Sequence, residues 1–472
     1  MTESAEISMG LPAHGEVADL LETLAREYLV PGVQFAVYER GEITSFVHGE
    51  MSYGSGRPVT PDTVFPWGSV TKSATALLLA QLVSDGDLEL DEPVGPLLPE
   101  LAATPNSPLY TATPRSLLSH TAGLPDMPPV EGDLSLRDCV AASADVTALC
   151  EPGVRFSYAN LGYVLAGRVL ESVTGVTWWE AVRDFVLTPL GVTPGFLGGS
   201  APAPVAGQHA VHLPTGTVQP VDEPGLPRAL VPAGALLSSA VGLLRYAAVH
   251  LTPDAAGVLE PELLAVMRTP VPGSAAFGLA EGWGLGLAVH TDGAGRTWLG
   301  HDGNTGGASC SLRLDPERGI AMALMTNATS GRQMGNAFFD ALAAKGFDIG
   351  HFREPDLGVP LSGADLDEAA AEVCGKYRSG ADLLTVRRRG GGDDGEGGDG
   401  ELVLDRPGLR PAVLEIHQGL EFRLRSETAG RHASDESKDL YCFVRDSRTG
   451  RVGGMYMSGG RLQVREGIGR LG

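Results

Sequence analysis

Ser69 and Lys72 stand three residues apart in the segment SVTK, and they are residue types that can perform acyl-transfer chemistry together. On a helix, residues three apart share a face, so the amine of Lys72 can reach the hydroxyl of Ser69. A buried lysine can be uncharged near pH 7, and an uncharged amine can accept the proton of that hydroxyl. The pair therefore predicts a serine nucleophile with a lysine base. Because one S-x-x-K can also arise by chance, the hypothesis needs partners elsewhere in the chain.

Lysine is rare in this protein, which makes its presence at position 72 informative. Of the 35 Lys+Arg residues only four are lysines, at positions 72, 345, 376 and 438. Arginine evidently serves as the general cation, and arginine stays protonated in proteins whereas lysine can lose its proton. A lysine at position 72 thus favours a role in proton transfer.

A second group of candidate residues is Tyr158 and Asn160, in the segment RFSYANLGY. A phenol can both donate and accept a proton, and a carboxamide can orient a lysine and a substrate carbonyl together. The two residues precede an apolar run over residues 161–173 that we expect to be a helix. Capping of that helix is an alternative role, and these residues taken alone leave both roles open.

A third group is centred on His301, in the segment GHDG at residues 300–303, which runs into NTGG. Glycines such as Gly303 allow a substrate backbone to approach closely. A lone histidine is more often structural than catalytic, so His301 becomes a candidate only in combination with the other two groups.

The elements that must position these residues can be read from hydrophobic periodicity and from glycine and proline. The segment FPWG interrupts regular structure before Ser69, and SATALLLAQLVSDG predicts a buried helix ending near Gly86. Ser69 would then lie at a helix N-terminus, where free backbone N–H groups favour negative charge. We expect further helices over residues 16–29 and 334–344, and strands over residues 33–38, 43–47, 298–300, 308–314 and 320–326.

The C-terminal part of the chain has a different pattern. After a loop-like junction over residues 352–365, six short strand candidates recur at regular spacing, which predicts a small all-β barrel or sandwich. They cover residues 383–386, 401–404, 412–416, 421–424, 441–444 and 454–457. The insert GGGDDGEGGDG at residues 390–400 predicts a solvated hairpin tip, and its spacing does not match an EF-hand calcium loop.

Composition restricts the class of protein. A length of 472 residues favours two domains, and a formal charge of −23 argues against nucleic acid or an anionic membrane as the main partner. No apolar run approaches membrane-spanning length, and the N-terminal residues do not resemble a secretory signal. Five scattered cysteines without a CxxC pair fit reduced thiols, so we expect a cytoplasmic protein.

The sequence gives no indication of a cofactor or metal. His209 and His212, in QHAVH, have a spacing that could suit a metal, but no third ligand is evident, and we interpret them as loop histidines. We therefore expect no metal site and no cofactor.

In this order the three groups resemble the motifs of the serine β-lactamase and penicillin-binding-protein superfamily, S-x-x-K, Y-x-N and H-x-G. About ninety residues separate the first motif from the second, and about one hundred and forty separate the second from the third. The flanking segments LLSHTAGLP at residues 117–125 and GDLELDEPV at residues 86–94 agree, and the resemblance spans roughly residues 16–345. It implies an α+β fold in which an antiparallel sheet is flanked by helices and joined by a helical lobe. The G-x-S-x-G motif of α/β-hydrolases does not surround Ser69.

Within the superfamily the chain most resembles the penicillin-binding-protein-type thioesterases, which are stand-alone peptide cyclases of nonribosomal peptide assembly lines. The resemblance is carried by FPWGSVTK at residues 65–72, WGLGL at residues 283–287, and GHDG running into GGASC at residues 306–310. Those enzymes carry a C-terminal lipocalin-like β-barrel domain. We therefore predict a catalytic domain over residues 1–352 and a lipocalin-like domain over residues 366–472.

Two departures from the wider superfamily matter. His301 stands where β-lactamases and D,D-peptidases usually carry lysine, which weakens a β-lactam-carboxylate role. No E-x-x-L-N segment follows the second motif, so the deacylating glutamate of class A β-lactamases is missing.

The resemblance implies a role for each candidate residue. Ser69 would be the nucleophile, Lys72 its base, and Tyr158 a proton relay held by Lys72 and His301. The oxyanion would lie between the backbone N–H groups of Ser69 and Asn304. Asn160 would orient the substrate, which would also contact Gly303 and Arg461. The last residue follows two glycines and could instead be a solvated surface arginine.

The implied reaction releases a nonribosomal peptide by head-to-tail macrolactamisation, with a D-configured residue at the acyl position. The partner would be a linear peptide bound to a peptidyl carrier protein or otherwise activated as a thioester. The alternative is hydrolysis by the same site, as an esterase, a D-aminopeptidase or D,D-peptidase, or a β-lactamase-like enzyme. A non-catalytic binding protein is disfavoured, because all five motif side chains are present.

Overall fold

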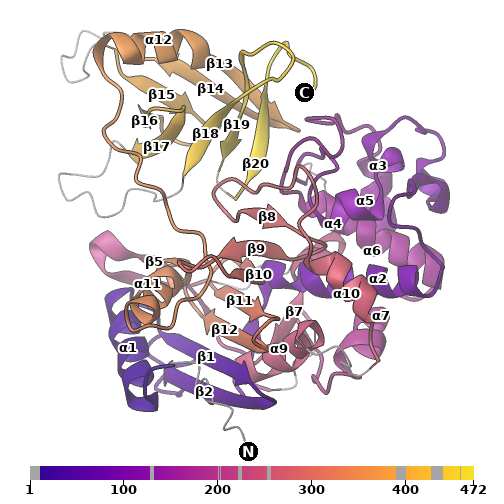
Figure 1. Ribbon diagram of the computed structural model, residues 1–472, viewed down its shortest axis with the longest axis vertical. Coiled ribbons are helices and arrows are strands. Elements are labelled where there is room, and N and C mark those ends of the chain that lie inside the picture. The colour runs from indigo at the N-terminus through magenta and orange to yellow at the C-terminus, as the bar shows by residue number, and fades with distance from the viewer. Residues whose placement is uncertain are drawn as a thin grey trace, which may run out of the picture. The chain divides into compact units, whose positions relative to one another are not determined.

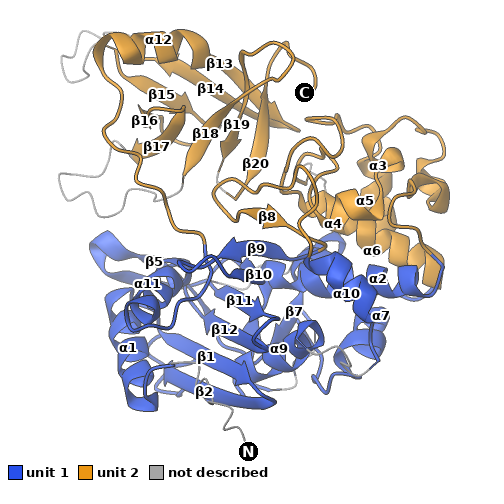
Figure 2. Ribbon diagram, in the orientation of Figure 1, with its two compact units in different colours: residues 1–87, 175–268, 286–351 blue, residues 88–174, 269–285, 352–472 orange. Residues whose placement is uncertain are grey.

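The computed structural model describes residues 11–127, 132–199, 201, 203–221, 226–251, 257–389, 400–426, 440–457 and 459–472. The chain divides into two compact units, each built from three stretches of sequence (Figure 2). The first unit comprises residues 1–87, 175–268 and 286–351, and the second comprises residues 88–174, 269–285 and 352–472.

The first unit combines a large sheet with helices, as labelled in Figure 1. Its helices are α1 (His14–Glu27), α2 (Thr71–Ser84), α7 (Trp178–Ala181), α8 (Val231–Gly234), α9 (Ala240–Ala247), α10 (Pro261–Arg268) and α11 (Gly331–Ala344). Its strands are β1 (Gly32–Glu39), β2 (Glu42–Gly49), β3 (Phe65–Pro66), β4 (Gly195–Phe196), β5 (Gln208–His212), β6 (Thr217–Val221), β7 (Leu236–Ser238), β9 (Ala288–Thr291), β10 (Thr297–Asn304), β11 (Ser309–Asp315) and β12 (Ile320–Thr326).

The main sheet of this unit is antiparallel and runs in the order β2-β1-β12-β11-β10-β9. The strands predicted over residues 33–38 and 43–47 are confirmed as β1 and β2, which form a hairpin turned by Gly41 with a φ of 89°. The strands predicted over residues 298–300, 308–314 and 320–326 are confirmed as β10, β11 and β12. The first of these predictions was too short, because β10 continues through His301 to Asn304.

The two faces of the sheet are covered by different helices. Alternate residues of β1, including Phe35, join the apolar faces of α1 and α11 in one core cluster. Side chains alternate between the two faces of a strand, so the neighbouring Gln34 points to the other face. There its Oε1 accepts a hydrogen bond from the backbone N–H of Ala240, the first residue of α9, at 2.8 Å. The predicted α+β arrangement, with a sheet between helices, is therefore confirmed.

The second unit contains a group of helices and a barrel. Its helices are α3 (Pro108–Thr111), α4 (Pro114–Leu118), α5 (Leu136–Ala142), α6 (Asn160–Thr174) and α12 (Gly363–Val373), and one short strand is β8 (Gly282–Trp283). The barrel strands are β13 (Gly375–Ser379), β14 (Asp382–Arg388), β15 (Leu402–Asp405), β16 (Ala412–Ile416), β17 (Glu421–Ser426), β18 (Tyr441–Arg445), β19 (Val452–Met457) and β20 (Arg461–Arg465).

The barrel is closed and antiparallel, and alternate residues of its strands fill its interior. The six predicted strands correspond to β14 to β19. The sequence analysis missed β13 and β20, which pair with each other and close the barrel. Each has only five residues, two of them basic, so their alternation is difficult to distinguish from a loop. Closure leaves no unpaired sheet edge.

Within the second unit the barrel is tied to the segment that precedes α6. Leu149 and Cys150 share an apolar cluster with Tyr456 and Leu462 of the barrel. The Tyr456 hydroxyl donates a hydrogen bond of 2.9 Å to the carbonyl oxygen of Phe156. Residues about 300 positions apart in the sequence are thus held together two residues before Tyr158.

Three further predictions concern a hairpin tip, the domain limits and membrane-spanning helices. Of the predicted hairpin tip at residues 390–400, residues 390–399 lie outside the described residues. The predicted domain limits, 1–352 and 366–472, stay predictions. In the part of the chain that the structure describes, no helix combines the length and the apolar composition needed to cross a bilayer.

Candidate active site

Ser69 lies in a 3-10 turn, Gly68–Val70, that leads directly into α2. Its side chain is partly exposed, whereas Lys72, in the first turn of α2, is fully buried. Lys72 Nζ lies 3.0 Å from Ser69 Oγ, so the contact predicted from their spacing is present. The catalytic roles of the two residues remain predictions.

Helix α2 is buried on nearly every side, and this packing holds Lys72 in place. Lys72 Nζ also donates to the carbonyl oxygen of Ala233 in α8, at 2.9 Å. The hydroxyl of Thr75 donates to the carbonyl oxygen of Pro232 at 2.7 Å and accepts from the indole N–H of Trp178 at 3.0 Å. These bonds fix α8 against α2, and they leave the Lys72 amine directed at Ser69.

Strand β10 lies directly against the turn that carries Ser69. A Cβ atom on Gly303 would lie 1.9 Å from the carbonyl oxygen of Trp67 and 2.9 Å from the backbone nitrogen of Ser69. A Cβ atom on Gly68 would lie 2.8 Å from the backbone nitrogen of Asn304. Only glycine at these two positions permits the contact, which brings the backbone nitrogens of Ser69 and Asn304 to one place. Two such N–H groups are the usual elements of an oxyanion hole.

His301 is buried in the interior of β10. Its Nδ1 lies 2.7 Å from the carbonyl oxygen of Asp302, and because a carbonyl only accepts, Nδ1 must carry the proton. Burial, together with the Lys72 ammonium when Lys72 is protonated, lowers the pKa of His301 to about 3. The ring is therefore neutral at pH 7, and its Nε2 carries a lone pair that can accept a hydrogen bond. A lysine at this position would supply a positive charge instead.

Asp302, the next residue, anchors this part of β10. Its carboxylate accepts two hydrogen bonds from Arg313 of β11, at 2.8 and 2.9 Å. Burial opposes ionisation of Asp302, but the Arg313 guanidinium outweighs it and holds the pKa of the carboxyl well below its usual range. The Nε of Arg313 donates to the carbonyl oxygen of Gly350, so the buried guanidinium is bonded on both sides, whereas the Asp302 side chain is 36% exposed.

Tyr158 lies in the second unit, buried, just before α6. Its ring stacks on His120 with ring centroids 4.3 Å apart. The backbone N–H of Ala159 donates to Nδ1 of His120 at 3.2 Å, so this nitrogen is unprotonated. The backbone N–H of Tyr158 donates to the carbonyl oxygen of Gly460, in the turn between β19 and β20.

Asn160 and Arg461 are joined by a residue that the sequence analysis missed, Asp126. The backbone N–H of Asn160 donates to Asp126 Oδ1 at 2.8 Å, and Arg461 Nε donates to Asp126 Oδ2 at 2.6 Å. The guanidinium carbon of Arg461 lies 5.2 Å from the centroid of the Tyr158 ring. A solvated surface role for Arg461 is wrong, because its side chain is two-thirds buried and paired.

The structure thus assembles the predicted residues in two clusters. In the first unit it brings together Ser69, Lys72, His301, Gly303 and Asn304. In the second unit it brings together Tyr158, Asn160 and Arg461. Sequence reasoning missed His120, Asp126 and the Ala233 carbonyl. The segment LLSHTAGLP, which supported the family resemblance, contains His120 and ends one residue before Asp126, so it could have pointed to both residues.

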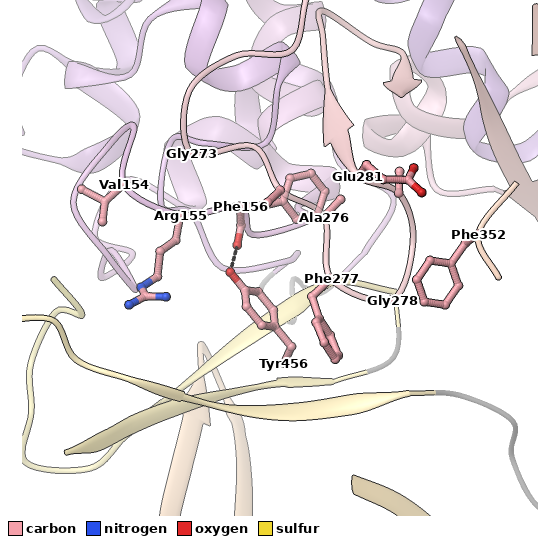
Figure 3. A pocket seen from close by; sticks show the side chains of 12 residues that line it. Val154, Arg155, Phe156, Gly273, Ala276, Phe277, Gly278, Glu281, Phe352 and Tyr456 are labelled. Carbon is pink, nitrogen blue, oxygen red and sulfur yellow. Dashed lines mark hydrogen bonds between the residues drawn. The ribbon is translucent and has the colours of Figure 1, made fainter. Parts of the chain in front are cut away.

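A pocket of about 480 Å³ opens in the second unit next to the Tyr158 cluster, and Figure 3 shows its lining. Aromatic side chains form much of its wall, with Arg155 and Glu281 at its sides (Figure 3). The aromatic residues are Phe156, Phe277, Phe352 and Tyr456. The pocket can accommodate an apolar group.

The histidines of QHAVH have a structural explanation. They lie in strand β5 and not in a loop, so that interpretation was wrong. His209 is buried, accepts a hydrogen bond at Nε2 from the backbone N–H of Tyr53, and bonds through Nδ1 to the carbonyl oxygen of Asn327. Among the described residues no cluster of histidine, cysteine, aspartate and glutamate side chains could hold a metal.

Comparison with known proteins defines the class to which this site belongs. The family model described as Beta-lactamase matches residues 17–345. Penicillin-binding protein 4 of Amycolatopsis lactamdurans is 37% identical over 337 residues, which cover 66% of this chain and 85% of that protein. The chain belongs to the beta-lactamase family, and the protein is an enzyme of the serine β-lactamase and penicillin-binding-protein superfamily.

Solved structures extend the similarity to the barrel. The crystal structure of SurE is 38% identical, with a TM-score of 0.78, and the match covers 96% of this chain and 98% of SurE. The crystal structure of SurE with D-Leu is also 38% identical, with a TM-score of 0.76, and covers 96% of this chain and 99% of that chain. This chain is thus similar to SurE across the catalytic region and the barrel.

Proposed function

We propose that this protein is a serine acyltransferase that releases a nonribosomal peptide from its carrier thioester by head-to-tail macrolactamisation. The observation that carries the proposal is the 3.0 Å contact between Ser69 Oγ and a fully buried Lys72 Nζ. This pair forms an acyl-enzyme in the superfamily to which the chain belongs. The similarity to SurE over 96% of the chain supports the narrower assignment.

In the proposed first step, Ser69 Oγ attacks the thioester carbonyl carbon while uncharged Lys72 accepts the hydroxyl proton. The oxyanion is held by the backbone N–H groups of Ser69 and Asn304, and one such donor contributes about 3 kcal/mol. The carbon–sulfur bond then breaks, and the family motif assigns to Tyr158 the delivery of a proton to the leaving thiol. The His301 ring is neutral and protonated at Nδ1, so the lone pair of its Nε2 can accept a hydrogen bond from an O–H donor.

In the proposed second step, the N-terminal amine of the peptide attacks the seryl ester, and Tyr158, which gave its proton to the thiol, takes a proton from the amine. The bond between the carbonyl carbon and Ser69 Oγ breaks as the amide bond forms, and Lys72 returns the proton to Ser69 Oγ. Because amine and ester belong to one molecule, the step is effectively intramolecular, which can supply about 7–11 kcal/mol. The structure of SurE with D-Leu supports a D-configured residue at the acyl position of the substrate.

The proposed partner is a linear peptide carried on a peptidyl carrier protein or activated by an equivalent thioester. Such a carrier would meet the enzyme in the cytoplasm, the location predicted from the sequence. The closed barrel is proposed to be the lipocalin-like domain of these cyclases.

The test is a product assay with a synthetic linear peptidyl thioester that ends in a D-residue. We expect the cyclic peptide as the main product by mass spectrometry, and no turnover by the Ser69→Ala variant. Purely linear acid as the product, at any substrate concentration, would contradict the cyclase proposal while leaving the acyl-enzyme intact.

Hydrolysis of the acyl-enzyme is the alternative function, and the partial exposure of Ser69 favours it, because water can reach the ester. Cyclisation and hydrolysis share the first step and differ only in the acceptor. The ratio of cyclic peptide to linear acid measures the preference directly.

A further inference from the structure

Asp126 and Arg461 form an ion pair at the centre of the second cluster. Arg461 Nε donates to Asp126 Oδ2 at 2.6 Å, and the two side chains are 36% and 27% exposed, respectively. Residues 335 positions apart supply the two charges, so the pair depends on the fold and not on local sequence.

Both members of the pair are ionised at neutral pH. Burial opposes the charge on Asp126, but Arg461 and the backbone N–H of Asn160 outweigh it and lower its pKa. Burial also opposes the charge on Arg461, and Asp126 outweighs it and raises its pKa. The pair as a whole therefore carries no net charge.

The turn before Arg461 fixes the position of its guanidinium. Arg461 follows Gly459 and Gly460, and the carbonyl oxygen of Gly460 accepts the backbone N–H of Tyr158 at 3.1 Å. A Cβ atom on Gly460 would lie 2.8 Å from the ring of Phe156, so this turn is seated tightly. The guanidinium comes to rest beside the Tyr158 ring, and Asp126 also accepts the first backbone N–H of α6.

We propose that Asp126 is a positioning and specificity residue, which holds Arg461 beside Tyr158 as a hydrogen-bond donor without net charge. This inference rests on the proposed function, in which Arg461 contacts the peptide. A donor of this kind suits a neutral peptide carbonyl, whereas a carboxylate must compete with Asp126 for the guanidinium.

The consequence fits the proposed reaction. The peptide enters as a thioester, is held as a seryl ester and leaves as a lactam, and none of these carries a carboxylate at its acyl end. The linear acid, which hydrolysis would produce, does carry one. Asp126 therefore discriminates against binding of the hydrolysis product.

The experiment measures binding directly, so that it does not depend on cyclisation. Two probes are used, a tetrapeptide ending in D-Leu as the free acid and the same tetrapeptide as the C-terminal amide. Their dissociation constants are measured by calorimetry on the full chain carrying Ser69→Ala, alone and combined with Asp126→Asn or Arg461→Gln. Asn keeps the size of Asp and one acceptor oxygen but removes the charge.

We expect Asp126→Asn to shift the ratio of the two affinities toward the acid by about tenfold or more, since it exposes the peptide to an uncompensated guanidinium. We expect Arg461→Gln to weaken the amide and to leave no preference for the acid. Equal losses for both probes in Asp126→Asn would show that Asp126 only stabilises the fold, and would overturn the proposal. Failure of both probes to bind the Ser69→Ala parent would also overturn it.

The matched control is Asp91→Asn. Asp91 accepts two hydrogen bonds from Arg115, at 2.7 and 2.8 Å, and lies in the same unit but outside the cluster. We expect the affinity ratio of this variant to equal that of the parent. The thioester assay could give only linear acid while the affinity ratio still shifts as expected. That result would contradict the cyclase proposal but would support the role of Asp126.

Discussion

The two clusters of candidate residues are built in different ways. The Ser69 cluster depends on one apolar helix, α2, which is buried on nearly every side, and on backbone contact with β10. The Tyr158 cluster depends on a stacked histidine, an ion pair and a turn from the barrel. The first is thus fixed by close packing, whereas the second is held by polar bonds between distant segments. We therefore expect substitutions in the Ser69 cluster to cause large losses of activity, and substitutions in the Tyr158 cluster to cause small changes in stability.

The largest effect is expected from Ser69→Ala, which removes the nucleophile of the close-packed cluster. Turnover should fall by about 10⁴- to 10⁶-fold, as in other enzymes that lose a covalent nucleophile. The measurement is the rate of thioester consumption, with labelling of Ser69 by an acylating probe as a second readout. Ser84→Ala, at the exposed end of the same helix, should behave like the parent. A Ser69→Ala variant as fast as the parent would contradict the assignment.

Lys72→Arg tests whether the buried cation must be able to lose its proton. Arginine keeps the positive charge but cannot act as a base, so the rate of Ser69 acylation should fall by about 10²- to 10⁴-fold. The measurement is stopped-flow acylation by a chromogenic ester. Lys345→Arg is the control, because Lys345 is partly exposed and pairs with Glu16 on the surface. Parent-like acylation by Lys72→Arg would exclude Lys72 as the base.

Gly303→Ala tests the backbone contact between β10 and the Ser69 turn. The new Cβ atom would lie 1.9 Å from the Trp67 carbonyl oxygen, so the strand and the turn must separate. Loss of one oxyanion donor should lower kcat by about 10²- to 10³-fold with a smaller change in KM. Gly15→Ala adds a methyl group where no atom lies within 4 Å and should leave kcat unchanged. Unchanged kcat in Gly303→Ala would remove Asn304 from the proposed oxyanion hole.

Acid should weaken the first unit through its buried neutral histidines. Burial lowers the pKa of His250 to about 3, and neither ring nitrogen of His250 has a hydrogen-bond partner among the described residues. Below pH 6.5 the unfolded chain gains a proton that the folded chain excludes, so stability is full above that pH and falls as the pH drops toward 3. Between pH 7 and 5 this one histidine should cost about 2 kcal/mol of unfolding free energy.

Urea unfolding at pH 7 and at pH 5 measures this loss. His250→Leu should reduce the difference between the two free energies of unfolding by about 2 kcal/mol. His301, whose pKa is also about 3, contributes with the same sign and remains in this variant. An equal difference in parent and variant would show that His250 is protonated in the fold.

The smallest effect is expected from the ion pair of the second cluster. Asp126→Ala and Arg461→Ala should each destabilise the protein, and the double variant should lose less than their sum by about 1 kcal/mol, because both side chains are partly exposed. A double-mutant cycle by urea unfolding measures this coupling. Strict additivity would mean that the pair contributes no coupling energy to the fold.

The sequence was most informative where the chemistry is local. The contact between Ser69 and Lys72 follows from their three-residue spacing, and β16 was placed at its observed limits. Asp126 could not be found in the same way, because its partner, Arg461, lies 335 residues away. The neutral state of His301 was also beyond sequence reasoning, since it depends on burial and on the bond to the Asp302 carbonyl.

The extension of β10 shows the same limit. The segment GHDG is rich in glycine and reads as the end of a strand, yet it pairs fully with β11. Glycine is used there because a side chain at position 303 would collide with the Trp67 carbonyl, which only the folded chain places nearby.

The bonds between the barrel and the segment before α6 have a consequence for recombining this enzyme with its relatives. Tyr456 bonds to the Phe156 carbonyl, and Gly460 accepts the backbone N–H of Tyr158. A chimera that receives a barrel from a relative but keeps its own residues 149–160 would combine two segments whose side chains and hydrogen-bonding groups are not complementary. Working hybrids should therefore be those in which both stretches come from the same parent.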